Sequence, residues 1–180
     1  ETQIDVLIPN FDSELIPMIK LEGDLKKIGI QMLLPSLENY NERHKSNLPS
    51  FGEKYDVLVP RSYPLSSEGD IYQAMRELSY PVVIKGNMYD ATVVANIEQA
   101  LAQYYRISQK WGLPVILQEF ISGTEGNVIA LGDGKGNTIA AVPMRKQYIT
   151  DKGKAWGGIT IDNKEMLELT DHIISSSNWA

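Results

Sequence analysis

Short apolar runs alternate with helical patterns along the middle of the chain, and this alternation constrains the fold more than any other sequence feature. Residues 80–87 and 91–96 are apolar runs of strand length, and residues 97–111 carry a helical pattern that Asn96 caps. A Gly-Leu-Pro sequence ends that helix, and another apolar run begins at Val115. The sequence therefore predicts two strands, a helix and a third strand in succession.

Patterns at the two ends of the chain complete the predicted fold class. An apolar run at 5–9, a helical segment at 12–29 and a second run at 30–35 predict a crossover between parallel strands. Asp12 or Ser13 is the expected N-cap of this helix. Residues 126–149 predict two strands around a tight turn, and residues 163–177 predict a helix. Because parallel crossovers and antiparallel hairpins are mixed, we predict an α+β (mixed α/β) fold and not a doubly wound sheet.

The organisation of these elements indicates two parts. Residues 1–48 are interpreted as the C-terminal part of an α/β domain, and residues 49–180 as the beginning of a second domain. The chain opens almost directly on a strand and stops just after a helix, so we expect an internal piece of a longer protein. The other predicted elements are a short helix, a linker, a strand and a helix, at residues 36–45, 46–56, 57–65 and 66–78.

Composition narrows the class of partner. The 180 residues carry a formal charge of -6, whereas nucleic-acid proteins usually present a basic face. The chain has no cysteine, which excludes disulfides and thiolate chemistry, and no apolar run of membrane-helix length. His44 and His172 stand apart in unlike contexts, which favours ordinary structural positions over metal ligands. We therefore expect a cytoplasmic protein with no nucleic-acid or membrane partner.

A glycine-rich stretch from Asp133 to Asn137 superficially resembles a phosphate-binding loop. Such a loop needs a helix directly after it, because the helix N-terminus faces the anion. Here residues 138–144 have the pattern of a strand. The stretch therefore predicts a hairpin turn with glycines at positive φ.

Two lysines are candidates for binding an anion. Lys85 sits where an apolar strand ends, so its stem can pack in the core while its ammonium group reaches a cleft. The alternative is a solvated strand terminus. Lys45, on a short polar helix, has a case no stronger than that of Lys85 when taken alone.

Polar residues also follow the strand that begins at Val115. Gln118 and Phe120 share one face of that strand and Glu119 the other, because side chains alternate. A strand end of this kind can form the wall of a small-molecule pocket that offers main-chain groups to a purine. The turn after it carries Glu125, whose carboxylate can accept hydrogen bonds from sugar hydroxyls. The alternative is a strand that has simply reached the surface.

Three segments in this order carry a resemblance to the ATP-grasp superfamily: 80–87, 113–131 and 136–146. Within that superfamily the sequence looks most like proteins similar to the large subunit of carbamoyl phosphate synthase, over about residues 5–180. The resemblance implies a truncated ATP-grasp-like fold in residues 49–180. Residues 1–48 are then similar to the end of the Rossmann-like domain that precedes ATP-grasp.

The resemblance also implies roles around ATP. Lys85 and Lys45 match lysines that contact the phosphates, although His44 stands where the pattern usually has Asp. Preplaced cations of this kind stabilise phosphate charge. Arg145 is the candidate catalytic residue of a basic segment that tends to face phosphates or the carboxylate substrate. A charged loop without that role is the alternative for this segment, whose other basic residues are Lys146, Lys152 and Lys154.

On the adenosine side, the resemblance gives Gln118 the position that faces the adenine amino group. Glu119 and Ile121 would present a main-chain carbonyl and N–H to the adenine edge, and Phe120 would support this hinge. Glu125 falls where the family has its ribose-binding carboxylate.

Two departures from the family pattern qualify these roles. The glycine-rich lid that usually follows Lys85 is short here, with one glycine in residues 86–94. The Mg²⁺ ligands of the family would lie beyond Ala180, and none is expected from the aspartates of this chain at 133, 151, 162 and 171. The resemblance thus implies a fragment of an enzyme that uses ATP and Mg²⁺ to activate a carboxylate or bicarbonate and pass it to an amine. Alone it would not turn over. The alternatives are a non-catalytic ATP-binding regulatory module and a plain interaction domain.

Overall fold

The computed structural model describes residues 3–87, 89–149 and 155–180. The chain divides into two compact units, each built from segments that are distant in sequence. The first unit combines Glu1–Glu42, Ile129–Ala141 and Lys164–Ala180, and the second combines Arg43–Val128 and Val142–Asn163. The division at residue 48 into two domains stays a prediction.

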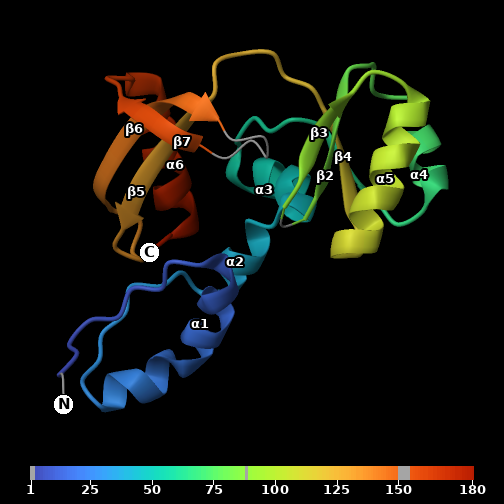
Figure 1. Ribbon diagram of the computed structural model, residues 1–180. Coiled ribbons are helices and arrows are strands. Elements are labelled where there is room, and N and C mark those ends of the chain that lie inside the picture. Colours follow the sequence, from blue (N-terminus) through green and yellow to red (C-terminus); the bar gives the residue numbers. More distant parts are fainter. Residues whose placement is uncertain (1–2, 88, 150–154) are drawn as a thin grey trace. The chain divides into compact units, whose positions relative to one another are not determined.

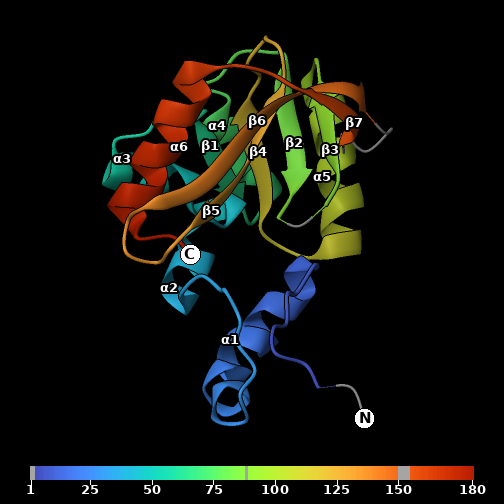
Figure 2. The same cartoon turned by 90° about the vertical axis from the view of Figure 1, so that its left-hand side faces the viewer.

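A four-stranded sheet forms the centre of the second unit. Its strands are β1 (Ser62–Leu65), β2 (Val82–Gly86), β3 (Ala91–Val94) and β4 (Val115–Glu119). They lie side by side in the order β1-β4-β2-β3, and each neighbouring pair is antiparallel (Figure 2). Helices α4 (Glu68–Ala74) and α5 (Ile97–Trp111) cover one face of this sheet (Figure 1).

The helix-covered face carries the hydrophobic core of this unit. Ile84 and Leu117 pair across β2 and β4, and both are fully buried with Ile71 of α4 and Ile107 of α5. Removing such side chains from water is the main stabilising contribution to a fold of this size. Because side chains alternate along a strand, the neighbours of these core residues point to the opposite face.

Helix α5 begins and ends at the residues that its capping signals predict. The Asn96 side chain accepts a hydrogen bond from the N–H of Gln99 at 2.9 Å, as an N-cap should. The helix ends before Gly112, whose φ of 78° suits glycine. Ser67 is the N-cap of α4, and its main-chain N–H donates to the Asp70 carboxylate at 2.9 Å.

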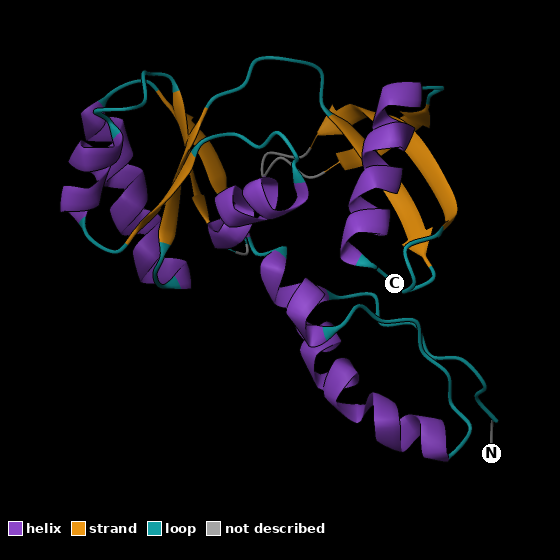
Figure 3. Cartoon of the chain, turned by 180° about the vertical axis from the view of Figure 1, so that it is seen from behind, coloured by secondary structure: helices purple, strands orange, loops and turns teal. Residues whose placement is uncertain are grey.

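The segment predicted as a linker is largely helical. It contains the 3-10 turn η1 (Lys45–Asn47) and α3 (Leu48–Tyr55), which Figures 1 and 3 show on the opposite side of the sheet from α4 and α5. Pro49 stands in the first helical turn, where a missing N–H costs nothing. A side chain at Gly52 would come within 2.7 Å of the Val57 carbonyl, so this glycine permits close packing. The strand predicted at 57–65 is correspondingly short.

The N-terminal segment of the first unit differs from the predicted crossover. Helix α1 (Asp12–Lys27) forms, followed by the short α2 (Leu37–Glu42), but the predicted strands at 5–9 and 30–35 reduce to one parallel bridge between Val6 and Gln31. The predicted parallel pairing is therefore confirmed, whereas the predicted length of the two strands is wrong. With no further strand beside it among the described residues, Val6 remains 59% exposed, so burial does not support an extended ladder.

The start of α1 also corrects a predicted cap. Asp12 or Ser13 was expected to cap this helix, but the N-cap is Phe11. The carboxylate of Glu14 accepts the main-chain N–H of Phe11 and that of Asn10, each at 3.3 Å. The Glu14 carboxylate thus takes the role that the sequence suggested for the side chain of an N-cap residue.

A second sheet contains β5 (Gly126–Gly132), β6 (Thr138–Ile149) and β7 (Ala155–Thr160), in that order. Asp133 closes the β5–β6 turn by accepting the N–H groups of Lys135 and Asn137, and the two glycines between them have positive φ. The hairpin turn is therefore confirmed. Helix α6 (Lys164–Ser177) follows, and the main-chain N–H of Gly134 donates to the carbonyl of Trp179 just after it. No helix in the described part of the chain has the length and apolar character that a bilayer requires.

Candidate functional site

Lys85 and Gln118 meet on the face of the sheet that α4 and α5 do not cover. The Lys85 Nζ donates to Gln118 Oε1 at 2.6 Å, and Gln118 Nε2 donates to Ser62 Oγ at 2.6 Å. The Ser62 hydroxyl in turn donates to the Pro60 carbonyl at 2.9 Å. Strand register explains the meeting, since Gln118 pairs with Ser62 on one side and with Val83, two residues from Lys85, on the other. The structure thus brings two of the predicted site residues into contact.

The ammonium group of Lys85 stands in a poorly solvated and locally positive place. Burial, together with the nearby charge of Lys45, lowers the pKa of Lys85 from 10.5 to about 8. Lys45 is itself half-buried in η1. Two cations that repel each other across a partly dehydrated space make a favourable environment for an anion. Such an arrangement suits phosphates better than a neutral ligand.

Glu119 and the two residues after it form the exit of β4. Both Glu119 carboxylate oxygens bind Arg61, and the Glu119 N–H donates to the Arg61 carbonyl at 2.9 Å. These bonds lower the pKa of Glu119, the main-chain N–H of Arg61 contributing most. Phe120 and Ile121 are 43% and 64% exposed, so the chain leaves the sheet with apolar side chains open to a ligand or solvent.

Glu125 pairs with Lys146, a partner that the sequence analysis did not predict for it. The Lys146 Nζ lies 2.7 Å from Glu125 Oε2, and the Lys146 N–H donates to the Glu125 carbonyl at 3.2 Å. Lys146 is 16% exposed, whereas Arg145, one residue earlier on β6, points to the other side and is exposed. Because side chains on a strand point alternately to its two faces, the strand pattern of this basic segment is the sequence signal that separates Lys146 from Arg145. The loop interpretation of residues 145 and 146 is therefore wrong.

The turn between β2 and β3 is short and tied to α5. The Gly86 N–H donates to the Asp90 carbonyl at 3.0 Å. The Asp90 carboxylate accepts the Trp111 indole N–H at 2.7 Å and the Lys110 ammonium at 3.1 Å. These contacts, the Trp111 hydrogen bond foremost, lower the pKa of Asp90. The Asp90 side chain, at the position of the expected phosphate lid, is thus anchored to the end of α5.

The described residues contain no group of three or more His, Asp or Glu side chains that could hold a metal ion. No Mg²⁺ ligand is therefore assigned in this chain. Three further candidates from the sequence, Asp151, Lys152 and Lys154, lie outside the described residues.

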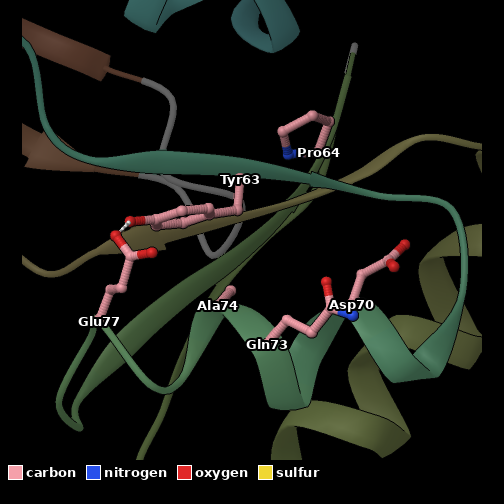
Figure 4. Close-up of a pocket in the computed structure, with 6 residues that line it drawn as sticks. All are labelled: Tyr63, Pro64, Asp70, Gln73, Ala74 and Glu77. Atoms are coloured by element: carbon pink, nitrogen blue, oxygen red, sulfur yellow. Dashed lines mark hydrogen bonds between the residues drawn. The ribbon is translucent and has the colours of Figure 1, made fainter.

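A pocket of about 240 Å³ lies along the edge strand β1 and α4 (Figure 4). It contains none of the predicted site residues; its lining is Tyr63, Pro64, Asp70, Gln73, Ala74 and Glu77. The two carboxylates there already serve the fold, since Asp70 caps α4 and Glu77 accepts the Tyr63 hydroxyl at 2.7 Å. Tyr63 also points away from the face of its neighbour Ser62. The pocket is therefore distinct from the Lys85–Gln118 site.

Comparison with solved structures relates the fold to enzymes that bind ATP. The biotin carboxylase domain of 2-oxoglutarate carboxylase from Hydrogenobacter thermophilus, in complex with MgADP, ADP and bicarbonate, matches with a TM-score of 0.74 and 15% identity over 96% of this chain and 41% of that one. Biotin carboxylase from Campylobacter jejuni matches with a TM-score of 0.74 and 16% identity, over 97% and 43%. D-alanine–D-alanine ligase from Bacillus anthracis, complexed with ATP, matches with a TM-score of 0.67 and 14% identity, over 98% and 62%.

These neighbours are ATP-grasp enzymes, and the present chain spans about 40 to 60% of their lengths. No protein-family model matches the sequence, and no curated protein matches it. At identities of 14 to 16% the likeness speaks for the fold alone. The predicted fold class is confirmed: the chain is a mixed α/β protein with the ATP-grasp fold, of which it spans a part.

Proposed function

We propose that this chain forms the nucleotide-binding side of an ATP-dependent carboxylate ligase. Such an enzyme forms an acyl phosphate from a carboxylate or bicarbonate and transfers the acyl group to an amine. The observation that carries the proposal is the contact of Lys85 with Gln118 beside Lys45, directly before the exposed exit of β4. In this contact the ammonium group of Lys85, which would bind the phosphates, lies next to the side-chain carbonyl of Gln118, which would accept a hydrogen bond from the adenine amino group.

Each predicted residue then has a task in this site. Lys85 and Lys45 would hold the phosphates, Gln118 the adenine amino group, and the main chain of residues 119–121 the adenine edge, with Phe120 as support. Glu125 would accept the ribose hydroxyls while Lys146 fixes its carboxylate. Arg145 would face the carboxylate substrate. We further propose the finer relationship to the large subunit of carbamoyl phosphate synthase and a cytoplasmic location.

Magnesium belongs to the proposed ligase reaction. The biotin carboxylase neighbour was solved with MgADP. Because no metal-binding cluster occurs among the described residues, no residue of this chain is assigned to the ion.

The second candidate is a regulatory module that binds ATP without catalysis. The short connection between β2 and β3 favours it, because a short lid shields phosphates less from water than a long lid does. ADP formation by the intact protein with a panel of small carboxylates and amines separates the two. Carboxylate-dependent ADP formation supports the ligase, and its absence despite ATP binding supports the module.

Calorimetric titration with ATP tests the shared part of both proposals. Replacing Lys85 by Met should weaken ATP binding by about 10- to 100-fold, the usual effect of a lost charged hydrogen bond. Lys164→Met is the matched control, because Lys164 is an exposed residue of α6 paired with Glu168. Absence of heat and of any melting shift with ATP in the unmodified chain would contradict nucleotide binding and leave the plain interaction domain.

A further inference from the structure

The hydroxyl group of Ser62 is fully committed on the site face of the sheet. Ser62 is only 8% exposed. Its single proton goes to the Pro60 carbonyl, at 2.9 Å, so towards Gln118 the oxygen acts as an acceptor. The group it faces at 2.6 Å must therefore be the amide nitrogen of Gln118. Ser62 thereby dictates which way round the amide lies.

Lys85 imposes the same orientation from the other end. A protonated ammonium group donates and cannot accept, so the atom 2.6 Å from Lys85 Nζ is the carbonyl oxygen Oε1. Gln118 is 8% exposed, and both ends of its amide are occupied within the protein. A reversed amide would place two donors face to face at one end and leave the Ser62 oxygen without its donor at the other.

Nucleotide binding changes the balance between these two constraints. This step rests on the proposed function, in which the Lys85 ammonium turns to the phosphates and adenine takes its place at Gln118. Ser62 is then the group that still holds the amide. A carbonyl facing the base accepts from the 6-amino group of adenine, whereas a reversed amide would donate to a 6-keto group.

We infer that Ser62 is a positioning residue that makes the site selective for a 6-amino purine, by holding the Gln118 amide with its carbonyl towards the base. Selectivity of this kind arises because the wrong base leaves a buried polar group unpaired. The Pro60 carbonyl contributes to this selection, because it accepts the only hydroxyl proton of Ser62. That proton is then not free to donate to the carbonyl of a reversed Gln118 amide.

Calorimetric titrations with ATP and with purine riboside triphosphate, which lacks only the 6-amino group, isolate this contact. The unmodified chain should prefer ATP by about tenfold, the value of one good hydrogen bond. Ser62→Ala should reduce the preference to about two- or threefold and strengthen binding of inosine triphosphate relative to ATP. A preference of tenfold that persists in Ser62→Ala overturns the inference while the proposed function stands.

A second substitution separates orientation from simple loss of packing. Gln118→Glu in the Ser62→Ala background presents an acceptor in either orientation, so it should restore the preference for ATP over purine riboside triphosphate. A double variant as unselective as Ser62→Ala would show that orientation is not the cause. Absence of ATP binding in the unmodified chain would overturn the proposed function and this inference together.

Side-chain amide exchange in the unmodified chain needs no variant. Proton NMR should show at least one slowly exchanging Gln118 amide proton, because it donates to a buried oxygen. Rapid exchange of both protons would overturn the assigned orientation.

Discussion

Arg61 binds both carboxylate oxygens of Glu119: its main-chain N–H donates to Oε1 at 2.8 Å and its Nε to Oε2 at 2.9 Å. The same guanidinium group donates to the carbonyl of Glu77, after α4. The last residue of β4 is thus fastened to the chain that leads into β1. This fastening fixes where the main chain of Phe120 and Ile121 begins.

We expect Glu119→Gln to lower the melting temperature at pH 7 and to weaken ATP binding about three- to tenfold, less than the loss of Lys85, because Glu119 acts on the nucleotide only through the main chain that it positions. Folding lowers the pKa of Glu119 below its ordinary 4.5, so its stabilising effect is present above that pH and is lost as the pH falls through the folded-state pKa. The melting temperatures of the unmodified chain and of Glu119→Gln should therefore converge once the pH is below the folded-state pKa of Glu119. The exposed Glu22 of α1 provides the matched control as Glu22→Gln, and equal melting temperatures of the unmodified chain and Glu119→Gln at pH 7 would contradict this role.

Lys85 should make ATP binding depend on pH. Its pKa of about 8 means that a growing fraction of the free protein has a neutral Lys85 above that pH, and ATP must then restore the proton. Affinity should fall as the pH rises from 8 to 9.5, and the binding enthalpy at pH 8 should vary with the buffer used. Lys85→Arg stays charged throughout and should flatten the profile. An affinity that is constant from pH 7 to 9.5 in the unmodified chain would refute the assignment.

The same shift predicts the effect on stability. Between about pH 8 and 10.5 the unfolded chain holds a proton at Lys85 that the folded chain has released. The contribution of Lys85 to the free energy of unfolding should therefore rise across this window, measured as the difference between the unmodified chain and Lys85→Met.

Leu117→Ala should cost about 2–5 kcal/mol of the free energy of unfolding, because Leu117 is fully buried between the sheet and its helices. Val93→Ala removes carbon atoms from a strand residue that is 51% exposed and should cost less than about 1 kcal/mol. Urea denaturation of the two variants checks the difference. Similar losses would show that the core is not where the fold places it.

How far the sequence predicts this structure depends on whether the deciding contacts are local. Asn96 and the glycine after Trp111 mark α5 correctly because both act on their own helix ends. The turn at residues 133–137 was predicted for the same reason, since its Asp133 contacts lie within four residues.

Contacts between distant segments explain what the sequence did not predict. Helix α3 contains Pro49 and Gly52, which usually break helices, and only the close approach of residues 57–59 shows why a glycine stands there. The pairing of Glu125 with Lys146 spans 21 residues and depends on the register of β6. Ser62 was passed over because its partner, Gln118, lies 56 residues away.

Gly132→Ala should destabilise the hairpin of β5 and β6. A Cβ atom at this position would lie 2.0 Å from the Trp179 carbonyl, so the segment after α6 must move. Overpacking of this kind costs roughly 1–3 kcal/mol, and tryptophan fluorescence should report the displaced segment. Gly123→Ala is the matched control, because nothing lies within 4 Å of its added atom. An unchanged melting temperature for Gly132→Ala would contradict the close approach.

The hydrogen bonds from Trp111 and Lys110 to Asp90 have a consequence for protein engineering. They join the residue just before β3 to the C-terminal end of α5, so residues inserted between β2 and Asp90 would preserve both bonds only if Asp90 kept its place beside this helix end. A redesign of this connection should therefore leave Asp90, Lys110 and Trp111 unchanged.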